Sequence, residues 1–233
     1  MIEGQPLTRF LYLGDVYEAG SASDFALNYE PIFGRFATRT APTTGNHEWL
    51  SRYEGYYPYW KRVRGSRPPN YYAFSIAGWQ VLSLNSEAYH APVSPQLKWL
   101  RRKITRTPAF GNCRLAFWHR PRYSASGHSG SLDVEPFWRT LSGEARLILN
   151  GHSHNYQRFD PRRGLTEVIA GTGGRRIYNE RSSMDYPGLA VTLFRYGAVR
   201  LRLRKGEAAL AFVDIRGKIL DRRDIRCDPG REA

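Results

Sequence analysis

A layered α/β fold is predicted for this chain of 233 residues, on three observations. Short apolar runs with the length of buried strands recur along the chain. Segments with the period of an amphipathic helix lie between them. Aspartate, asparagine or histidine follows four short runs directly, as expected where strands of an open α/β sheet end at a ligand site. Because no internal repeat or linker interrupts the pattern, residues 1–233 are expected to form a single domain.

The apolar runs are expected to be strands buried in a sheet. They lie at residues 10–13, 79–84, 115–118, 147–149 and 168–170. The first expected helix follows the second run, because Ser94 is a suitable N-cap and Pro95 suits the first helical position. Leu97, Leu100 and Ile104 then fall on one face of that helix.

A second helix is expected near residues 134–141. Val134, Phe137, Trp138 and Leu141 follow the i, i+3, i+4, i+7 spacing, and Gly143 stands where such a helix would stop. After about residue 188, apolar residues alternate with arginine, which predicts half-exposed antiparallel strands over 188–226. Their arginines are expected to form a solvated sheet face, with nucleic-acid binding as the alternative.

Residues 49–72 differ from the rest of the chain. They contain many tyrosine and tryptophan residues among arginine and proline, without a clean period. We therefore expect an extended loop or lobe that is packed by its own aromatic side chains.

The composition constrains the partners of the protein. Thirty-five basic against 21 acidic residues give a net charge of +14, which attracts phosphorylated small molecules, nucleic acid, acidic polymers or anionic lipid without distinguishing among them. No run approaches the roughly 20 apolar residues of a membrane span, and the first residues do not resemble a signal peptide. Cys113 and Cys227 either pair in an exported protein or remain separate thiols.

The candidate functional residues lie where expected strands end. Asp15 follows the run at 11–13, and Asn46 follows residues 41–44 after one glycine. Five of the six histidines also lie at or just after such positions, a distribution that packing does not explain. They are His47, His119, His128, His152 and His154. All these strand ends are expected to meet at one edge of the sheet.

Carboxylate, amide and imidazole groups without thiolates suit zinc, iron, manganese or nickel. The spacing of His152 and His154 at a strand–loop junction allows two imidazoles to point to different metals, and Asp15 can bridge both. Two ions about 3.5–4 Å apart would bind an attacking hydroxide and the phosphoryl oxygens together. The residues thus favour a metal site that acts on phosphate esters.

The same residues resemble motifs two to five of the calcineurin-like metallophosphoesterases. The matching segments, in the family's order, are Gly14-Asp15, Gly45-Asn46-His47-Glu48, His119 and Gly151-His152-Ser153-His154. The segments similar to the bacterial purple-acid-phosphatase-like branch are Asn70-Tyr71-Tyr72-Ala73-Phe74, Leu84-Asn85-Ser86-Glu87, Trp118-His119-Arg120-Pro121 and Gly171-Thr172-Gly173-Gly174. The resemblance covers residues 10–174 and implies the metallophosphoesterase fold, a β-sheet sandwich flanked by helices.

The resemblance also implies a metal-binding role for each matching ligand. Asp15 would bridge two metals. The second metal would be bound by Asn46, His119 and His152, and the first by His154.

Two further histidines and two arginines would face the substrate. His47 is similar to the family histidine that contacts the phosphate and helps to protonate the leaving group. His128 is similar to a second substrate-facing histidine, with a flexible surface histidine as the alternative. Arg120 and Arg122 are candidates for steering the phosphate, and exposed loop arginines are the alternative.

The sequence departs from the family pattern at the first metal. The family opens with a strand that ends in an aspartate motif, whereas only Glu3 is acidic before Asp15. Purple acid phosphatases also place an iron-binding tyrosine three residues after the bridging aspartate, where Glu18 stands here. Tyr17 is one residue too early and would need the loop to readjust. The first metal keeps Asp15 and His154, so one bound ion is the alternative to two.

In the family the missing first strand lies centrally in the sheet, so its absence is expected to leave unpaired backbone. A sequence that begins inside the domain would explain this, and a reduced one-metal protein is the alternative. Such a beginning would also remove any signal peptide, so the location of the protein stays open, although the resembling family is often exported.

The predicted function is hydrolysis of small phosphate esters by metal-bound hydroxide, with two ions of iron, manganese or zinc. Only the resemblance favours phosphomonoesters over phosphodiesters, and the fold itself does not fix the substrate. The alternative is a non-catalytic phosphate- or polyanion-binding homologue with an incomplete metal site. A nucleic-acid-binding protein ranks third, since charge and aromatic content support it but no recognisable motif does.

Overall fold

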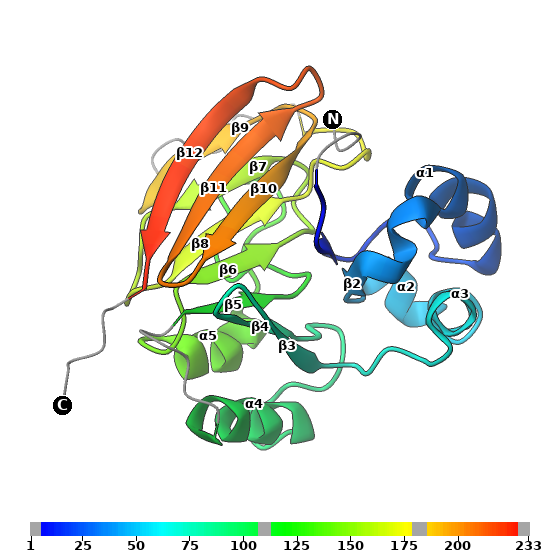
Figure 1. Cartoon of the computed structure of the whole chain (residues 1–233), viewed down its shortest axis with the longest axis horizontal. Helices are drawn as coiled ribbons and strands as arrows, with labels where there is room; N and C mark the ends of the chain where they lie inside the picture. Colours follow the sequence, from blue (N-terminus) through cyan, green and yellow to red (C-terminus); the bar gives the residue numbers. More distant parts are fainter. Residues whose placement is uncertain (1–5, 107–112, 179–185, 228–233) are drawn as a thin grey trace.

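The computed structural model describes residues 6–106, 113–178 and 186–227, which form a mixed α/β sandwich with helices packed against it (Figure 1). The larger sheet has seven strands, in the spatial order β3 (Tyr72–Ile76), β4 (Trp79–Ser83), β5 (Arg114–Phe117), β6 (Leu147–Asn150), β8 (Thr166–Ala170), β7 (Tyr156–Phe159) and β9 (Leu189–Leu193). An antiparallel sheet of β10 (Gly197–Arg204), β11 (Glu207–Asp214) and β12 (Ile219–Arg226) covers one face. The predicted layered α/β fold is confirmed.

The centre of the larger sheet is parallel, which brings strand ends together. Strands β4, β5, β6 and β8 all run in the same direction, so their carboxyl ends lie along one edge. Successive residues of β5 point to opposite faces. Leu115 and Phe117 pack toward the three-stranded sheet, whereas Ala116 packs toward the helices. Both faces are therefore covered, which is why this strand has a continuous apolar run.

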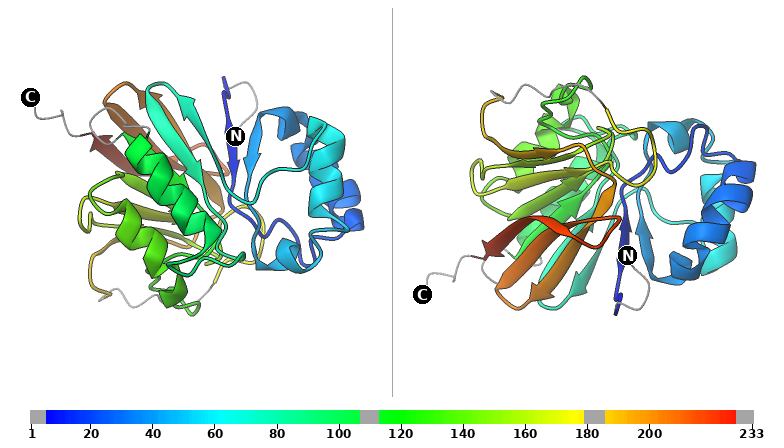
Figure 2. Two further views of the ribbon diagram at one scale, coloured as in Figure 1. Left: turned by 90° about the horizontal axis from the view of Figure 1, so that it is seen from below. Right: turned by 90° about the horizontal axis from the view of Figure 1, so that it is seen from above.

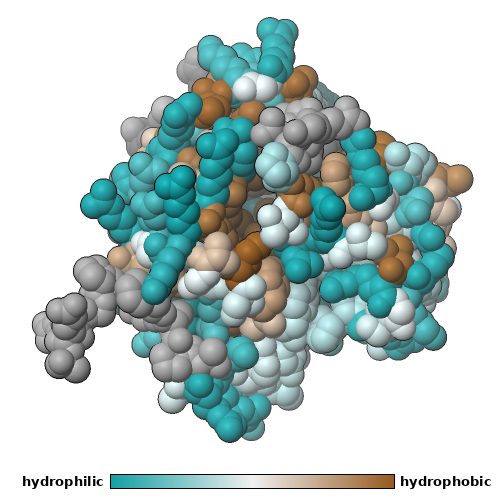
Figure 3. Space-filling view, viewed as in Figure 1, coloured by the Kyte–Doolittle hydropathy of each residue, from teal (hydrophilic) through white to brown (hydrophobic). Residues whose placement is uncertain are grey.

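A separate parallel pair, β1 (Phe10–Tyr12) with β2 (Thr40–Pro42), lies beside the sandwich. Among the described residues, no further strand pairs with β1, and none pairs with the outer edge of β10. This arrangement agrees with the expectation of unpaired backbone at this place. Figure 3 shows a recess with apolar atoms at its bottom next to the three-stranded sheet.

Both predicted helices are present and cover the second face of the larger sheet (Figure 2, left). They are α4 (Pro95–Arg106) and α5 (Glu135–Leu141). Helix α4 begins as predicted, because the Ser94 hydroxyl accepts a hydrogen bond from the Leu97 amide at 3.2 Å. Among the described residues, no helix combines the length and the apolar composition that crossing a membrane requires.

Of the extended loop or lobe expected at 49–72, the structure has a lobe packed by its own rings, the aromatic lobe, and this lobe is partly helical. It contains the end of α2 (Asn46–Leu50) and all of α3 (Tyr56–Arg64). Tyr56, Tyr59 and Trp60 share a helical face, and Tyr57 beside them obscures that period in the sequence. These rings pack against an unpredicted helical stretch comprising a π-helical turn (Asp24–Tyr29), α1 (Glu30–Phe33) and a 3-10 turn (Gly34–Arg39).

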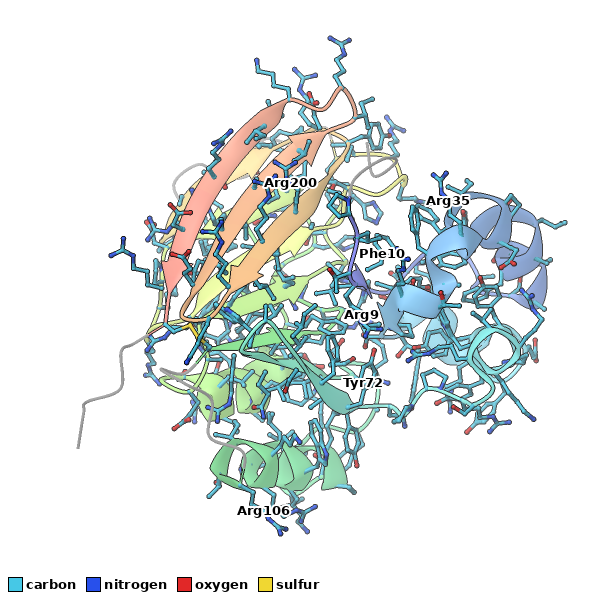
Figure 4. The ribbon with its side chains drawn as sticks, in the orientation of Figure 1. Arg9, Phe10, Arg35, Tyr72, Arg106 and Arg200 are labelled. Carbon is cyan, nitrogen blue, oxygen red and sulfur yellow. A yellow bond between two sulfur atoms is a disulfide. The ribbon has the colours of Figure 1, made fainter. Side chains whose placement is uncertain are left out.

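The C-terminal strands have the predicted alternation. Arg202 on β10 pairs with Ala209 on β11, and its side chain is exposed on the sheet face opposite the core. Arg200 lies two residues earlier on the same strand (Figure 4). A disulfide joins Cys113, just before β5, to Cys227, just after β12, so of the two alternatives the structure has the paired cysteines.

Candidate metal centre

Four side chains from four strand ends converge on one point. Asp15 and Asn46 follow β1 and β2, while His119 and His152 follow β5 and β6. The Nε2 atom of His119 lies 2.9 Å from Oδ2 of Asp15, 3.2 Å from Oδ1 of Asn46 and 3.1 Å from Nδ1 of His152. The structure therefore brings together the four residues that were predicted to bind the second metal.

The orientation of His119 is fixed by the backbone. Its Nδ1–H donates to the carbonyl oxygen of Leu13 at 2.9 Å, which leaves the Nε2 lone pair facing the other three side chains. The imidazole is fully buried, and its own carbonyl accepts the amide of Gly151 at 3.0 Å. The Leu13 carbonyl thus fixes the tautomer of the ring, and the Gly151 amide holds the backbone of His119.

The donor set fits a metal ion. Carboxylate, amide oxygen and imidazole lone pairs all face one another, an arrangement that a cation explains better than protons do. Two ligands at right angles to each other around a metal with bonds of about 2.1 Å are separated by about 3 Å, close to the separations at His119 Nε2. Among the described residues, Asp15, His119 and His152 form the one group of three ligating side chains with such proximity.

Backbone conformation at two ligands is unusual for residues with side chains. Asp15 has φ of 54° and His152 has φ of 65°, values at which non-glycine residues are uncommon. A Cβ atom on Gly45 would overlap Oδ1 of Asp15, so only glycine fits beside that carboxylate. Such strain typically clusters at functional sites.

Glu48 holds the loop of Asp15 in place, a role that the sequence analysis missed. This fully buried carboxylate accepts hydrogen bonds from the Tyr12 hydroxyl (2.5 Å) and the amides of Val16 (2.6 Å), Asp15 (2.8 Å) and Gly45 (2.9 Å). The signal was its place three residues after Gly45, where a glutamate commonly caps a helix start.

The electrostatics of the centre lower the pKa of two ligands, Asp15 and His152, and raise that of His119. Burial alone would raise the pKa of Asp15, but hydrogen bonds from His119 and from the His47 amide lower it to about 2. Burial opposes the charged form of His119 too, and Asp15 outweighs it, so that this pKa is raised. Burial and the charges of His119 and Arg120 lower the pKa of His152 to about 3. At neutral pH the imidazole of His152 therefore has its lone pairs available.

His47 stands at the edge of the centre. Its amide donates to Oδ1 of Asp15 at 2.9 Å, and its Nε2 lies 3.8 Å from Oδ2 of the same carboxylate. The Nδ1 atom contacts the carbonyl oxygen of Glu18. The side chain is 37% exposed, so a group bound at the centre can reach it.

His154 and His128 lie beside the four converging ligands. The His154 ring stacks on Tyr178, with centroids 4.6 Å apart, and burial together with the charges of His128 and Arg175 lowers its pKa. The exposed ring of His128 lies 5.0 Å from that of His152. Both histidines therefore lie next to the candidate metal centre, but they are not part of the group of side chains that surrounds His119 Nε2.

The two predicted substrate-facing arginines are bound to other carboxylates. Arg120 donates from Nε to both oxygens of Glu87, at 3.0 and 3.1 Å. Arg122 pairs with Glu135 of α5 and is not brought to the metal ligands. Tyr17 packs against the aromatic lobe, where burial and the charge of Asp24 raise its pKa.

Comparisons with known proteins agree with this geometry. The sequence model of the calcineurin-like phosphoesterase family matches residues 4–156 of this chain. A search of curated proteins gives no match.

Similar solved structures share the fold at low sequence identity. GAP50, described as the anchor in the inner membrane complex of Plasmodium, has a TM-score of 0.78 at 14% identity, covering 97% of this chain and 81% of GAP50. The purple acid phosphatase PPD1 from yellow lupin (Lupinus luteus) has a TM-score of 0.72 at 18% identity, covering 94% of this chain and 46% of PPD1. A dimetal phosphatase from Danio rerio has a TM-score of 0.62 at 15% identity, covering 95% and 84% of the two chains. With the family model matching most of its length, this chain belongs to the calcineurin-like phosphoesterases, a family of hydrolases that bind divalent metals.

Proposed function

We propose that this protein is a metal-dependent phosphomonoesterase. The observation that carries the proposal is the convergence of Asp15, Asn46 and His152 on the oriented Nε2 atom of His119. A metal held there would lower the pKa of a bound water and offset the charge of the phosphate. The preference for monoesters rests on the resemblance to the purple-acid-phosphatase-like branch.

The side chains around the ligands support a division of roles. His47 donates its Nδ1 proton to the Glu18 carbonyl, which leaves Nε2 directed toward the centre. From there it would hold the proton that the departing alkoxide takes up. His128 is exposed beside His152 and would contact the phosphate there. The Glu48 carboxylate keeps the Asp15 loop in its strained conformation.

The decisive experiment is hydrolysis of 4-nitrophenyl phosphate after loading with iron, manganese or zinc, with a chelator-treated control. We expect activity that is lost on chelation and in Asp15→Ala, together with a lower metal content in that variant. His47→Ala should lower kcat by roughly 10²–10⁴-fold while keeping its metal. The matched control is His90→Ala, because His90 pairs with Asp133 and not with the centre. Metal-loaded protein without any esterase activity would refute the proposal.

A second candidate is a non-catalytic phosphate-binding homologue. The position of His154 outside the closest ligand group favours it, because a second ion would have few ligands among the described residues. The two candidates differ in one measurement. Metal-loaded protein that binds inorganic phosphate in calorimetry but does not hydrolyse the aryl ester would identify a binding protein.

A further inference from the structure

The segment after β8, residues 171–178, is attached to the side of the centre where His154 lies. The Tyr178 amide donates to the His154 carbonyl at 3.1 Å, and the two rings stack. The right-hand view of Figure 2 shows this yellow segment reaching from the sheet toward the blue N-terminal part of the chain. An arginine in this segment therefore lies at the edge of the candidate metal centre, which we call its rim.

Arg175 is that arginine, and it spans the rim. Its guanidinium pairs with the Glu18 side chain in the loop that follows β1. The carbonyl of the same Glu18 contacts His47, and the charge of Arg175 acts on His154. One guanidinium thus lies near residues from both sides of the candidate metal centre.

The ion pair of Arg175 is easier to exchange than those of Arg120 and Arg122. Its partner Glu18 has a side chain that is 65% exposed, and Arg175 itself is 61% exposed. The partner of Arg120 is only 7% exposed, and that of Arg122 is 25% exposed. Exposed ion pairs contribute little net stability, so an incoming anion can replace Glu18 at low cost. A buried carboxylate cannot be left without its partner so easily.

We propose that Arg175 binds the phosphate group of the substrate, and that Glu18 neutralises it when the site is empty. This inference rests on the proposed esterase function and adds a basis for substrate class. A guanidinium binds phosphate oxygens through two parallel hydrogen bonds. A phosphomonoester has two negative charges near neutral pH, and a diester has one. Arg175 therefore favours monoesters.

The test compares Arg175→Gln with Arg176→Gln. Arg176 is the neighbouring exposed arginine, so the control removes the same charge from the same segment. Values of kcat/KM are measured for 4-nitrophenyl phosphate and for bis(4-nitrophenyl) phosphate with metal-loaded protein. Arg175→Gln should lower the monoester value about tenfold, mainly through KM, and the diester value less than about threefold. Arg176→Gln should change neither by more than about twofold.

A substitution of Glu18, the ion-pair partner of Arg175, should change phosphate binding in the opposite direction. Glu18→Gln frees the guanidinium, so KM for the monoester and the inhibition constant of inorganic phosphate should both fall. Equal losses for both esters in Arg175→Gln, or the same losses in Arg176→Gln, would overturn the assignment. They would show that only the general charge of the rim matters.

Phosphate binding separates this proposal from the esterase proposal. If the wild-type protein hydrolyses neither ester, calorimetry with inorganic phosphate is performed on the metal-loaded proteins. Weaker binding in Arg175→Gln than in Arg176→Gln would support the role of Arg175 while the esterase function fails. Equal binding in the two variants, or no binding by the wild type, would refute the role of Arg175.

Discussion

Two loops meet at the candidate metal centre, and each is fixed by a fully buried glutamate. The loop after β1 is held by Glu48, whose two oxygens each accept two hydrogen bonds. The loop after β5 is held by Glu167 on β8, whose oxygens accept one each, from the amides of Arg122 (2.8 Å) and Tyr123 (3.1 Å). Glu48 thus accepts four hydrogen bonds and Glu167 accepts two. The residues that donate to them also lie at different distances along the sequence from a metal ligand.

The difference shows how far a buried carboxylate is coupled to the centre. One of the amides that Glu48 binds belongs to the ligand Asp15 itself. Glu167 binds residues three and four positions after His119, and burial raises its pKa to about 8 although the two amides and Arg122 lower it. We therefore expect Glu48 to govern metal binding, and Glu167 to govern only the stability of the fold.

The largest expected effect comes from making the same substitution at both positions. In Glu48→Gln the amide nitrogen would face two donors, so unfolding free energy should fall by about 3–5 kcal/mol, and metal affinity by about 10–100-fold. Below pH 5, where Glu167 is protonated, Glu167→Gln loses one hydrogen bond and should cost about 1 kcal/mol, with metal affinity unchanged. Chemical denaturation and metal titration measure the two quantities. Equal effects on metal affinity would remove the distinction between the loops.

The second expected effect is a pH dependence that comes from Glu167. Its pKa is raised in the folded state from the ordinary 4.5 to about 8, so folding favours the protonated form. This contribution is fully present below pH 4.5 and is lost as pH rises from there to about 8, with a slope of at most about 1.4 kcal/mol per pH unit. The wild type should therefore lose stability relative to Glu167→Gln between pH 5 and pH 8. Parallel stability curves for the two proteins would contradict the raised pKa.

A smaller effect is expected beneath His128, at the far end of the loop after β5. The Ser124 hydroxyl lies 3.0 Å from that of Ser153 and 2.9 Å from that of Ser126. The hydroxyls of Ser126 and Ser153 in turn donate to the His128 carbonyl. Ser124→Ala should cost about 1 kcal/mol in unfolding free energy and lower kcat a few-fold. Metal affinity should not change. A loss of metal would mean that this loop, too, determines the ligand geometry.

The smallest effect is expected far from both loops, on the arginine face of β10. Arg202 is exposed, and among the described residues its side chain has no hydrogen-bond or ion-pair partner. Arg202→Gln should change unfolding free energy by no more than about 0.5 kcal/mol and leave kcat/KM for the aryl phosphate within about twofold. A larger loss of activity would show that this face takes part in substrate binding.

The sequence by itself determined the elements whose pattern is local. The runs that became β1, β4, β5, β6 and β8 could be predicted because strands covered on both faces are apolar throughout. Helix α4 could be predicted because Ser94 and Pro95 mark its start and its apolar spacing continues from there. The ligands Asp15, Asn46, His119 and His152 also followed from local position, since each stands within four residues of the end of a strand.

Only the tertiary structure decided features that depend on residues distant in the chain. Glu48 reaches back 33 residues to the amide of Asp15, and Arg175 reaches back 157 residues to Glu18. Cys113 and Cys227 are separated by 114 residues, and both were compatible with free thiols until their positions were known. Strand periodicity and capping describe neighbours along the chain. Hydrogen bonds and ion pairs between loops depend on how the sheets pack, which no local pattern encodes.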